Sequence, residues 1–145
     1  MGVEFRETMA GRYHLLASPH DERPLSFTLR AWSRALPSFV RRPLTEVAGE
    51  LHAEGWADHV AVRGTLALDL LRDGTLRYDL HFRGNDRLPY RLVGHKTVRL
   101  TRLVTTMSEL PVALLDHDGR RVGEADVRFD VRRDLSEFLR SWHLI

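Results

Sequence analysis

The sequence predicts a mainly β protein, a single antiparallel barrel of eight or nine strands around an apolar interior. Two observations lead to this prediction. Apolar and polar residues alternate with a period of two along most of the chain, as in strands that bury one face. Turn residues separate these runs at even intervals, and the 145 residues match the size of one domain. No repeat, low-complexity stretch or linker is visible, so we expect one domain over residues 1–145.

The clearest strand signals are residues 76–83 and 123–131, where every second residue is apolar. Asp-Gly pairs at 73–74 and 118–119, and Gly and Asn at 84–85, predict tight hairpin turns. Strands joined in this way form a meander, which hides its edges best by closing into a barrel. The expected strands span 5–16, 25–32, 47–57, 62–71, 75–83, 88–100, 102–107, 110–116 and 121–133.

Two segments depart from the alternating pattern. Ser33 to Leu44 is typical of a loop with one or two helical turns, which would form a short lid over one barrel mouth. Asp134 to Trp142 predicts a C-terminal helix, because Asp134 can cap it and Glu137 follows three residues later. Its apolar stripe, which we expect to pack against the barrel, consists of Leu135, Phe138, Leu139 and Trp142.

Composition narrows the class of protein. The absence of cysteine excludes disulfides and thiolate metal sites. The 22 basic and 20 acidic residues are interspersed, whereas nucleic-acid binders concentrate positive charge on one face, so we expect no nucleic-acid partner. No segment approaches the roughly 20 apolar residues of a membrane span, and residues 1–9 do not resemble a signal peptide. We therefore expect a cytoplasmic protein without a membrane span, and homodimerisation stays open.

Motifs for cofactor chemistry are absent from the sequence. It contains no glycine-rich phosphate loop, no nucleophile elbow and no His-Glu-x-x-His zinc motif. The eight histidines are scattered over expected polar faces and turns, whereas a metal site needs three or four ligands that converge. We expect neither a cofactor nor a metal.

The alternation places two charged residues on the inward face. Lys96 shares its face with Tyr90, Leu92 and Gly94, and Glu7 shares its face with Met9. A buried charge is costly unless it is paired, so the two are expected to be partners. They would form either a catalytic acid–base pair in an apolar cavity or a structural ion pair, and a β-bulge that turns one of them outward is a further alternative.

Aromatic residues are the expected walls of a ligand pocket. Gly55 within a strand pattern suggests a bulge that would turn Trp56 into the cavity or its mouth. Ordinary core packing is the alternative explanation for these side chains. The expected ligand-binding residues are Trp56, Tyr78, Phe82, Tyr90, Phe129 and Tyr13, with Thr105 also facing inward.

Five short motifs follow one another along nearly the whole chain: Phe5-x-Glu7-x-Met9-x-Gly11, Ala53-Glu54-Gly55-Trp56-Ala57-Asp58, Arg77-Tyr78-x-Leu80-x-Phe82, Leu92-x-Gly94-x-Lys96-x-Val98 and Val127-Arg128-Phe129. Together they resemble an accessory domain found beside or fused to bacterial GMC-type (cholesterol-oxidase-like) flavin oxidoreductases and some lipases. The resemblance implies a role near lipid or steroid-like metabolism and singles out Glu7 and Lys96. No dinucleotide fingerprint occurs here, so oxidoreductase activity is not carried over.

A second similarity, to small actinobacterial β-barrel cyclases of the spirotetronate Diels–Alderase kind, rests on residues 52–58 and on Leu92-x-Gly94. Those enzymes fold a polyene inside an apolar, aromatic-walled cavity without cofactor or metal. The similarity implies a cyclase of secondary metabolism. That pattern has an aromatic residue just after the Gly94 segment, where this sequence has Val98.

Three functions remain in view. The first is a calycin-like or allene-oxide-cyclase-like barrel that binds a lipid, steroid or polyketide-like molecule as a carrier or accessory protein. The second is a cofactor-free cyclase or isomerase in which Lys96 or Glu7 supplies the polar group. The third is an interaction module that docks through residues 33–44 or the C-terminal helix. The sequence leaves open whether the chain is an enzyme.

Overall fold

The computed structural model describes residues 3–33, 44–69, 75–97, 109–128 and 143–144. These residues form strands and no helix. The strands are β1 (Val3–Leu15), β2 (Arg23–Ser33), β3 (Leu44–Ala53), β4 (Ala57–Asp69), β5 (Thr75–Arg83), β6 (Pro89–Thr97), β7 (Glu109–Leu115), β8 (Arg121–Arg128) and β9 (His143–Leu144). No helix in this described part is long and apolar enough to cross a membrane.

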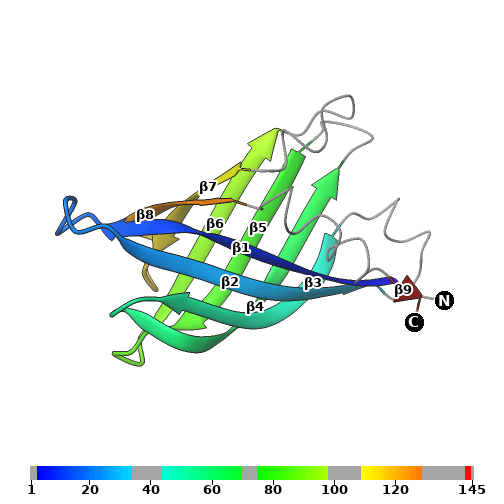
Figure 1. Ribbon diagram of the computed structural model, residues 1–145, viewed down its shortest axis with the longest axis horizontal. Helices are drawn as coiled ribbons and strands as arrows, with labels where there is room; N and C mark the ends of the chain where they lie inside the picture. The colour runs from blue at the N-terminus through cyan, green and yellow to red at the C-terminus, as the bar shows by residue number, and fades with distance from the viewer. Residues whose placement is uncertain (1–2, 34–43, 70–74, 98–108, 129–142, 145) are drawn as a thin grey trace.

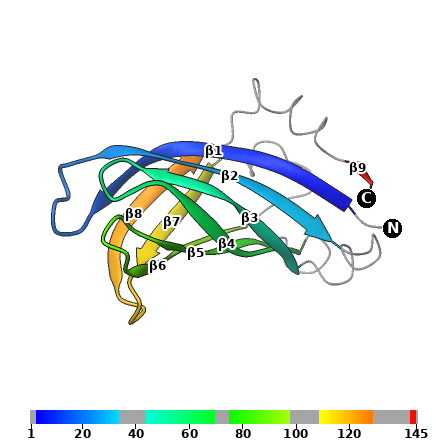
Figure 2. The same cartoon turned by 90° about the horizontal axis from the view of Figure 1, so that it is seen from below.

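The sheet closes on itself. Each strand from β1 to β8 pairs antiparallel with the next, and β8 pairs back with β1 (Figure 1). Figure 2 shows β1 and β2 on one side of the barrel and β5 and β6 on the opposite side. The two residues of β9 extend the sheet beside the start of β1. The predicted antiparallel barrel is therefore confirmed, with eight strands in the closed ring.

The short connections define one end of the barrel. Residues 16–22, 54–56, 84–88 and 116–120 join β1 to β2, β3 to β4, β5 to β6 and β7 to β8. Because the strands run up and down in turn, all four connections lie at the same end, which we call the hairpin end. The opposite end, where β1 begins and β2 ends, is called the far end.

The alternation seen in the sequence becomes the inside and outside of the barrel. In β5, Tyr78, Leu80 and Phe82 are buried, whereas Arg77 and His81 are exposed. The same period sets the inward face of the other strands, because successive side chains of a strand point to opposite faces. The inward residues form one hydrophobic core.

Two glycines allow the strands to approach closely where they bend. A Cβ atom on Gly11 would lie 1.7 Å from the carbonyl oxygen of Asp126 in β8, and one on Gly64 would lie 1.9 Å from that of Asp79 in β5. No side chain fits at such distances. Glycine at these positions therefore lets the sheet curve enough to close.

The structure corrects one local prediction. Residues 47–57 were expected to form one strand with a bulge at Gly55, but β3 ends at Ala53 and β4 begins at Ala57. Gly55 has φ +82°, and it lies in the tight turn between the two strands. The lid expected within 33–44 and the helix expected over 134–142 fall, except for the strand residues Ser33 and Leu44, outside the described residues.

Candidate functional site

Among the side chains that the structure describes, the barrel interior is apolar. The buried residues in this set are aliphatic, aromatic, methionine or glycine, and the tyrosine hydroxyls are their only polar side-chain groups. Phe27 of β2 and Tyr78 of β5 meet edge to face across the interior, with ring centroids 6.1 Å apart. Since β3 and β4 separate these strands in the sheet, this contact spans the barrel and fills it at that level.

An aromatic cluster closes the hairpin end. The Trp56 ring stacks on Tyr13 at 5.9 Å and meets Phe82 and Tyr90 edge to face at 5.5 and 4.7 Å. Phe82 and Tyr90 in turn stack at 5.9 Å. Such aromatic pairs stabilise a fold beyond the area that they bury. We call Tyr13, Trp56, Phe82 and Tyr90 the closing cluster.

The polar tips of the two tyrosines fix the cluster to the turns. The Tyr13 hydroxyl donates to the Glu54 carbonyl oxygen at 2.5 Å, and the Tyr90 hydroxyl donates to Asp86 Oδ2 at 2.5 Å. Burial raises the pKa of Tyr13 above its usual 10.0. The pKa of Tyr90 is raised, first by burial and then by the hydrogen bond to Asp86. A hydrogen bond with Trp56 lowers it and so offsets part of this increase.

The structure brings five of the predicted ligand-binding residues together. Tyr13, Trp56, Phe82 and Tyr90 form the closing cluster, and Tyr78 lies beyond them at the level of Phe27. Trp56 lies at the hairpin end of the barrel, in the turn between β3 and β4. Thr105 and Phe129 lie outside the described residues.

The predicted catalytic residues lie in strands that are not neighbours. Glu7 is in β1 opposite Leu29, and Lys96 is in β6 opposite Leu76. Both positions are in the far half of their strands, two residues from the buried Met9 and Gly94, respectively. Their side chains are outside the described part of the structure, so their pairing stays a prediction.

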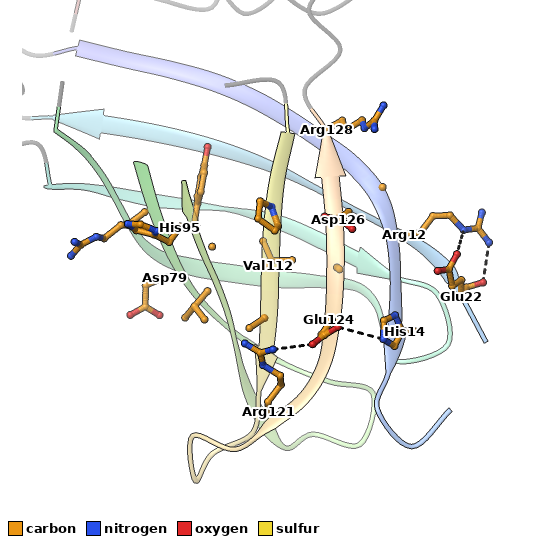
Figure 3. A pocket seen from close by; sticks show the side chains of 18 residues that line it. Arg12, His14, Glu22, Asp79, His95, Val112, Arg121, Glu124, Asp126 and Arg128 are labelled. Carbon is orange, nitrogen blue, oxygen red and sulfur yellow. Dashed lines mark hydrogen bonds and ion pairs between the residues drawn. The ribbon is translucent and has the colours of Figure 1, made fainter. Parts of the chain in front are cut away.

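A broad groove crosses the outer face of β1, β8, β7, β6 and β5 (Figure 3). Its volume is about 1070 Å³, and the small side chain of Ala113 on the outer face leaves it room. Some of its charged residues pair in Figure 3: Glu124 holds Arg121 at 2.9 Å and lies 3.8 Å from His14, and Glu22 lies 3.6 Å from Arg12. Four arginines and four carboxylates line the groove, so their charges balance.

Sequence reasoning missed a polar link at the hairpin end. Asn85 Nδ2 donates to Asp58 Oδ2 at 2.7 Å, and the Asp58 backbone N–H donates to Asn85 Oδ1 at 3.0 Å. Nearby, the rings of His52 and His59 stack with centroids 4.1 Å apart. Within the described ranges, no three His, Asp or Glu side chains converge in a way that could hold a metal ion.

Comparison with known proteins gives no relative. No family model, no curated protein and no solved structure matches this chain. The fold and the site therefore define a class by geometry alone: a closed, eight-stranded, antiparallel up-and-down barrel with an apolar interior and one aromatic-sealed end.

Proposed function

We propose that this chain binds a hydrophobic small molecule inside the barrel, in the manner of calycin-like proteins, as a carrier or accessory protein. The observation that supports this proposal is the difference between the two ends of the barrel interior. The closing cluster seals the hairpin end, while the inward face beyond Phe27 and Tyr78 continues as an apolar wall. Eight strands give an interior wide enough for side chains or for one small ligand.

The proposed pocket lies between the Phe27–Tyr78 contact and the far end. Its described wall is aliphatic, with Leu29, Leu66 and Val127 at 0–4% exposure. The ligand would enter from the far end and meet Glu7 and Lys96 as its polar anchors. A lipid, steroid or polyketide-like molecule has the apolar body that such a wall favours. This reading agrees with the resemblance to the accessory domains of lipid and steroid metabolism.

A polyene fatty acid whose fluorescence rises in apolar surroundings tests the proposal directly. Wild-type protein is expected to bind it at a 1:1 ratio. Leu66→Trp should fill the proposed pocket and abolish binding while the barrel stays folded, and Thr65→Trp, its neighbour on the opposite face of β4, should bind normally. A folded wild type that binds no probe contradicts the proposal, as does a Leu66→Trp protein that no longer folds, because the interior is then fully packed.

Analysis of the bound molecule distinguishes a carrier from an enzyme. Native mass spectrometry of freshly purified protein, followed by organic extraction, identifies a co-purifying ligand. A carrier returns the added ligand unchanged. A cyclase or isomerase would return a product of the same mass and different structure, and Lys96→Met would then abolish turnover while binding persists.

A further inference from the structure

A second groove lies on the outer face of β4, β5 and β6, next to the hairpin end. Its volume is about 880 Å³, within the range of small-molecule pockets. Four arginines and two histidines line it, and its one carboxylate is Asp116. Asp116 Oδ1 already accepts two backbone hydrogen bonds, from Asp118 and Arg120. With four arginines and one carboxylate, its lining carries a net positive charge, whereas four arginines and four carboxylates line the groove in Figure 3.

Strand register concentrates the positive charge. Arg63 of β4 lies opposite His81 of β5, and His81 lies opposite Arg91 of β6. Residues opposed in this way have Cβ atoms about 5 Å apart, and like charges at that spacing destabilise a sheet. Asp79 offsets two members of this row, because it pairs with Arg91 and lies 3.5 Å from His81. We call Arg63, His81 and Arg91 the cationic row.

The carboxylates of Asp79, Asp86 and Asp116 offset part of the charge of the four arginines, and a net positive charge remains. Asp79 is occupied by Arg91, which donates to both of its oxygens at 3.1 and 2.8 Å. Asp86 accepts from the Leu88 N–H and the Tyr90 hydroxyl. No carboxylate among the described residues pairs with Arg63 or Arg87, both of which are exposed.

The β5–β6 turn fixes the position of Arg87 beside the groove. Arg87 has φ +67°, a left-handed conformation that is uncommon for a residue other than glycine. The turn maintains it: the Arg87 N–H donates to the Gly84 carbonyl oxygen at 2.9 Å, and Arg83 Nη1 donates to the Arg87 carbonyl oxygen at 2.9 Å. The β7–β8 turn has the same pattern of backbone bonds around Gly119, which has φ +78°, so this conformation belongs to the hairpin turn. The turn thereby holds Arg87 at the groove.

We propose that this groove binds the phosphate group of a small phosphorylated molecule. Arg63, Arg83 and Arg87 approach from β4, the end of β5 and the β5–β6 turn, so guanidinium groups can reach a doubly charged phosphate from several sides. Pro89 and the Tyr90 ring supply an apolar wall for the body of the ligand. The concave shape favours a compact ligand over a membrane surface or a nucleic-acid strand.

Calorimetric titration of the intact chain with phenyl phosphate at low ionic strength tests this site. We expect 1:1 binding that weakens as salt is added. Arg87→Gly and Arg63→Gln are each expected to weaken it about tenfold, the usual effect of one lost charge-assisted hydrogen bond. Glycine suits the left-handed conformation at position 87, so this variant keeps the fold. Arg121→Gln, which removes an exposed arginine from the other groove, is the control and should bind as wild type does.

Three outcomes overturn the proposal. The first is a folded wild type that gives no binding. The second is equal weakening by Arg121→Gln and Arg87→Gly, which indicates general charge attraction. The third is binding to vesicles that contain an anionic phospholipid with no binding of phenyl phosphate, which assigns the groove to a membrane surface. None of these results bears on the barrel interior, because the groove is on its outer face.

Discussion

Asp58, at the start of β4, and Asn85, in the β5–β6 turn, are 27 residues apart in the sequence and share a pair of hydrogen bonds of 2.7 and 3.0 Å at the hairpin end. Asp58 also accepts from the Gly55 N–H at 3.1 Å, and the Asn85 N–H donates to the Trp56 carbonyl oxygen at 2.8 Å. These bonds hold the turn that carries Trp56 against the β5–β6 turn. The closing cluster thus depends on a polar link as well as on ring contacts.

This link predicts a loss of stability in acid. The hydrogen bonds from Asn85 and Gly55 lower the pKa of Asp58 below its usual 3.8. A carboxyl group whose pKa is lowered by folding stabilises the fold above the unfolded-state pKa, and this contribution is lost as the pH falls through the folded-state pKa. Urea unfolding from pH 6 downward should therefore show a steeper decline below about pH 4 in wild type than in Asp58→Asn.

Asn85→Ala removes the hydrogen-bond partner of Asp58 and can be compared with wild type by urea unfolding at the same pH values. It removes the largest cause of the lowered pKa, so its acid decline should be shallower than that of wild type. The double variant Asp58→Asn/Asn85→Ala should cost less stability than the sum of the two single changes, because they remove the same interaction. Additive costs would contradict the link.

Tyr13 predicts a loss of stability at the alkaline end. Folding raises the pKa of this hydroxyl, so its contribution is complete below the usual value of 10.0 and is lost as the pH rises through the folded-state pKa. Tyr13→Phe should cost about 1 kcal/mol at neutral pH through the lost bond to Glu54. Denaturant unfolding should then show a smaller decline above pH 10 in the variant, and an identical decline would contradict the assignment.

Gly11 and Gly119 need glycine for two different reasons, and alanine substitutions distinguish them. Gly119 has φ +78° and open space around its Cβ position, so Gly119→Ala should cost about 1 kcal/mol for the left-handed conformation alone. At Gly11 a Cβ atom would overlap the Asp126 carbonyl group, so Gly11→Ala should cost about 3 kcal/mol or prevent folding. Thermal unfolding followed by circular dichroism measures both, and equal effects would show that the strands separate at little cost.

The strand pattern made the barrel predictable, because one period of two governs both burial and pairing. The alternation over residues 77–83 is the burial pattern of β5, and the Asp-Gly turn at 118–119 does join β7 to β8. The turn at Gly55 was misassigned, since one glycine among apolar neighbours is compatible with a bulge or with a tight turn. The backbone conformation that decides between them is not visible in the sequence.

The site was less predictable for a different reason. The period of two could indicate that Tyr78 and Phe82 face inward, and this is where they lie. It could not indicate that Asp58 meets Asn85, or that Arg63, His81 and Arg91 share one row, because both depend on register between strands. A shift of one residue in that register would move each of these side chains to another neighbour.

Asp79 pairs with Arg91 and thereby reduces the positive charge beside the proposed phosphate site. It offsets the charge of Arg91 through two hydrogen bonds, and His81 Nε2 lies 3.5 Å from Asp79 Oδ1. Asp79→Asn removes one negative charge beside the groove and releases Arg91 toward the ligand. Phenyl phosphate should then bind several-fold more tightly in the same calorimetric titration.

The cost in stability should be small, below about 1 kcal/mol, because both partners are partly exposed and solvent screens the pair. Asp126→Asn is the control for the change in net charge, because it removes a carboxylate from the groove shown in Figure 3. Its affinity for phenyl phosphate should equal that of wild type. A tighter complex in Asp79→Asn alone identifies a local effect on the cationic row. Unchanged affinity in both variants would mean that Arg91 contributes nothing to an anion in this groove.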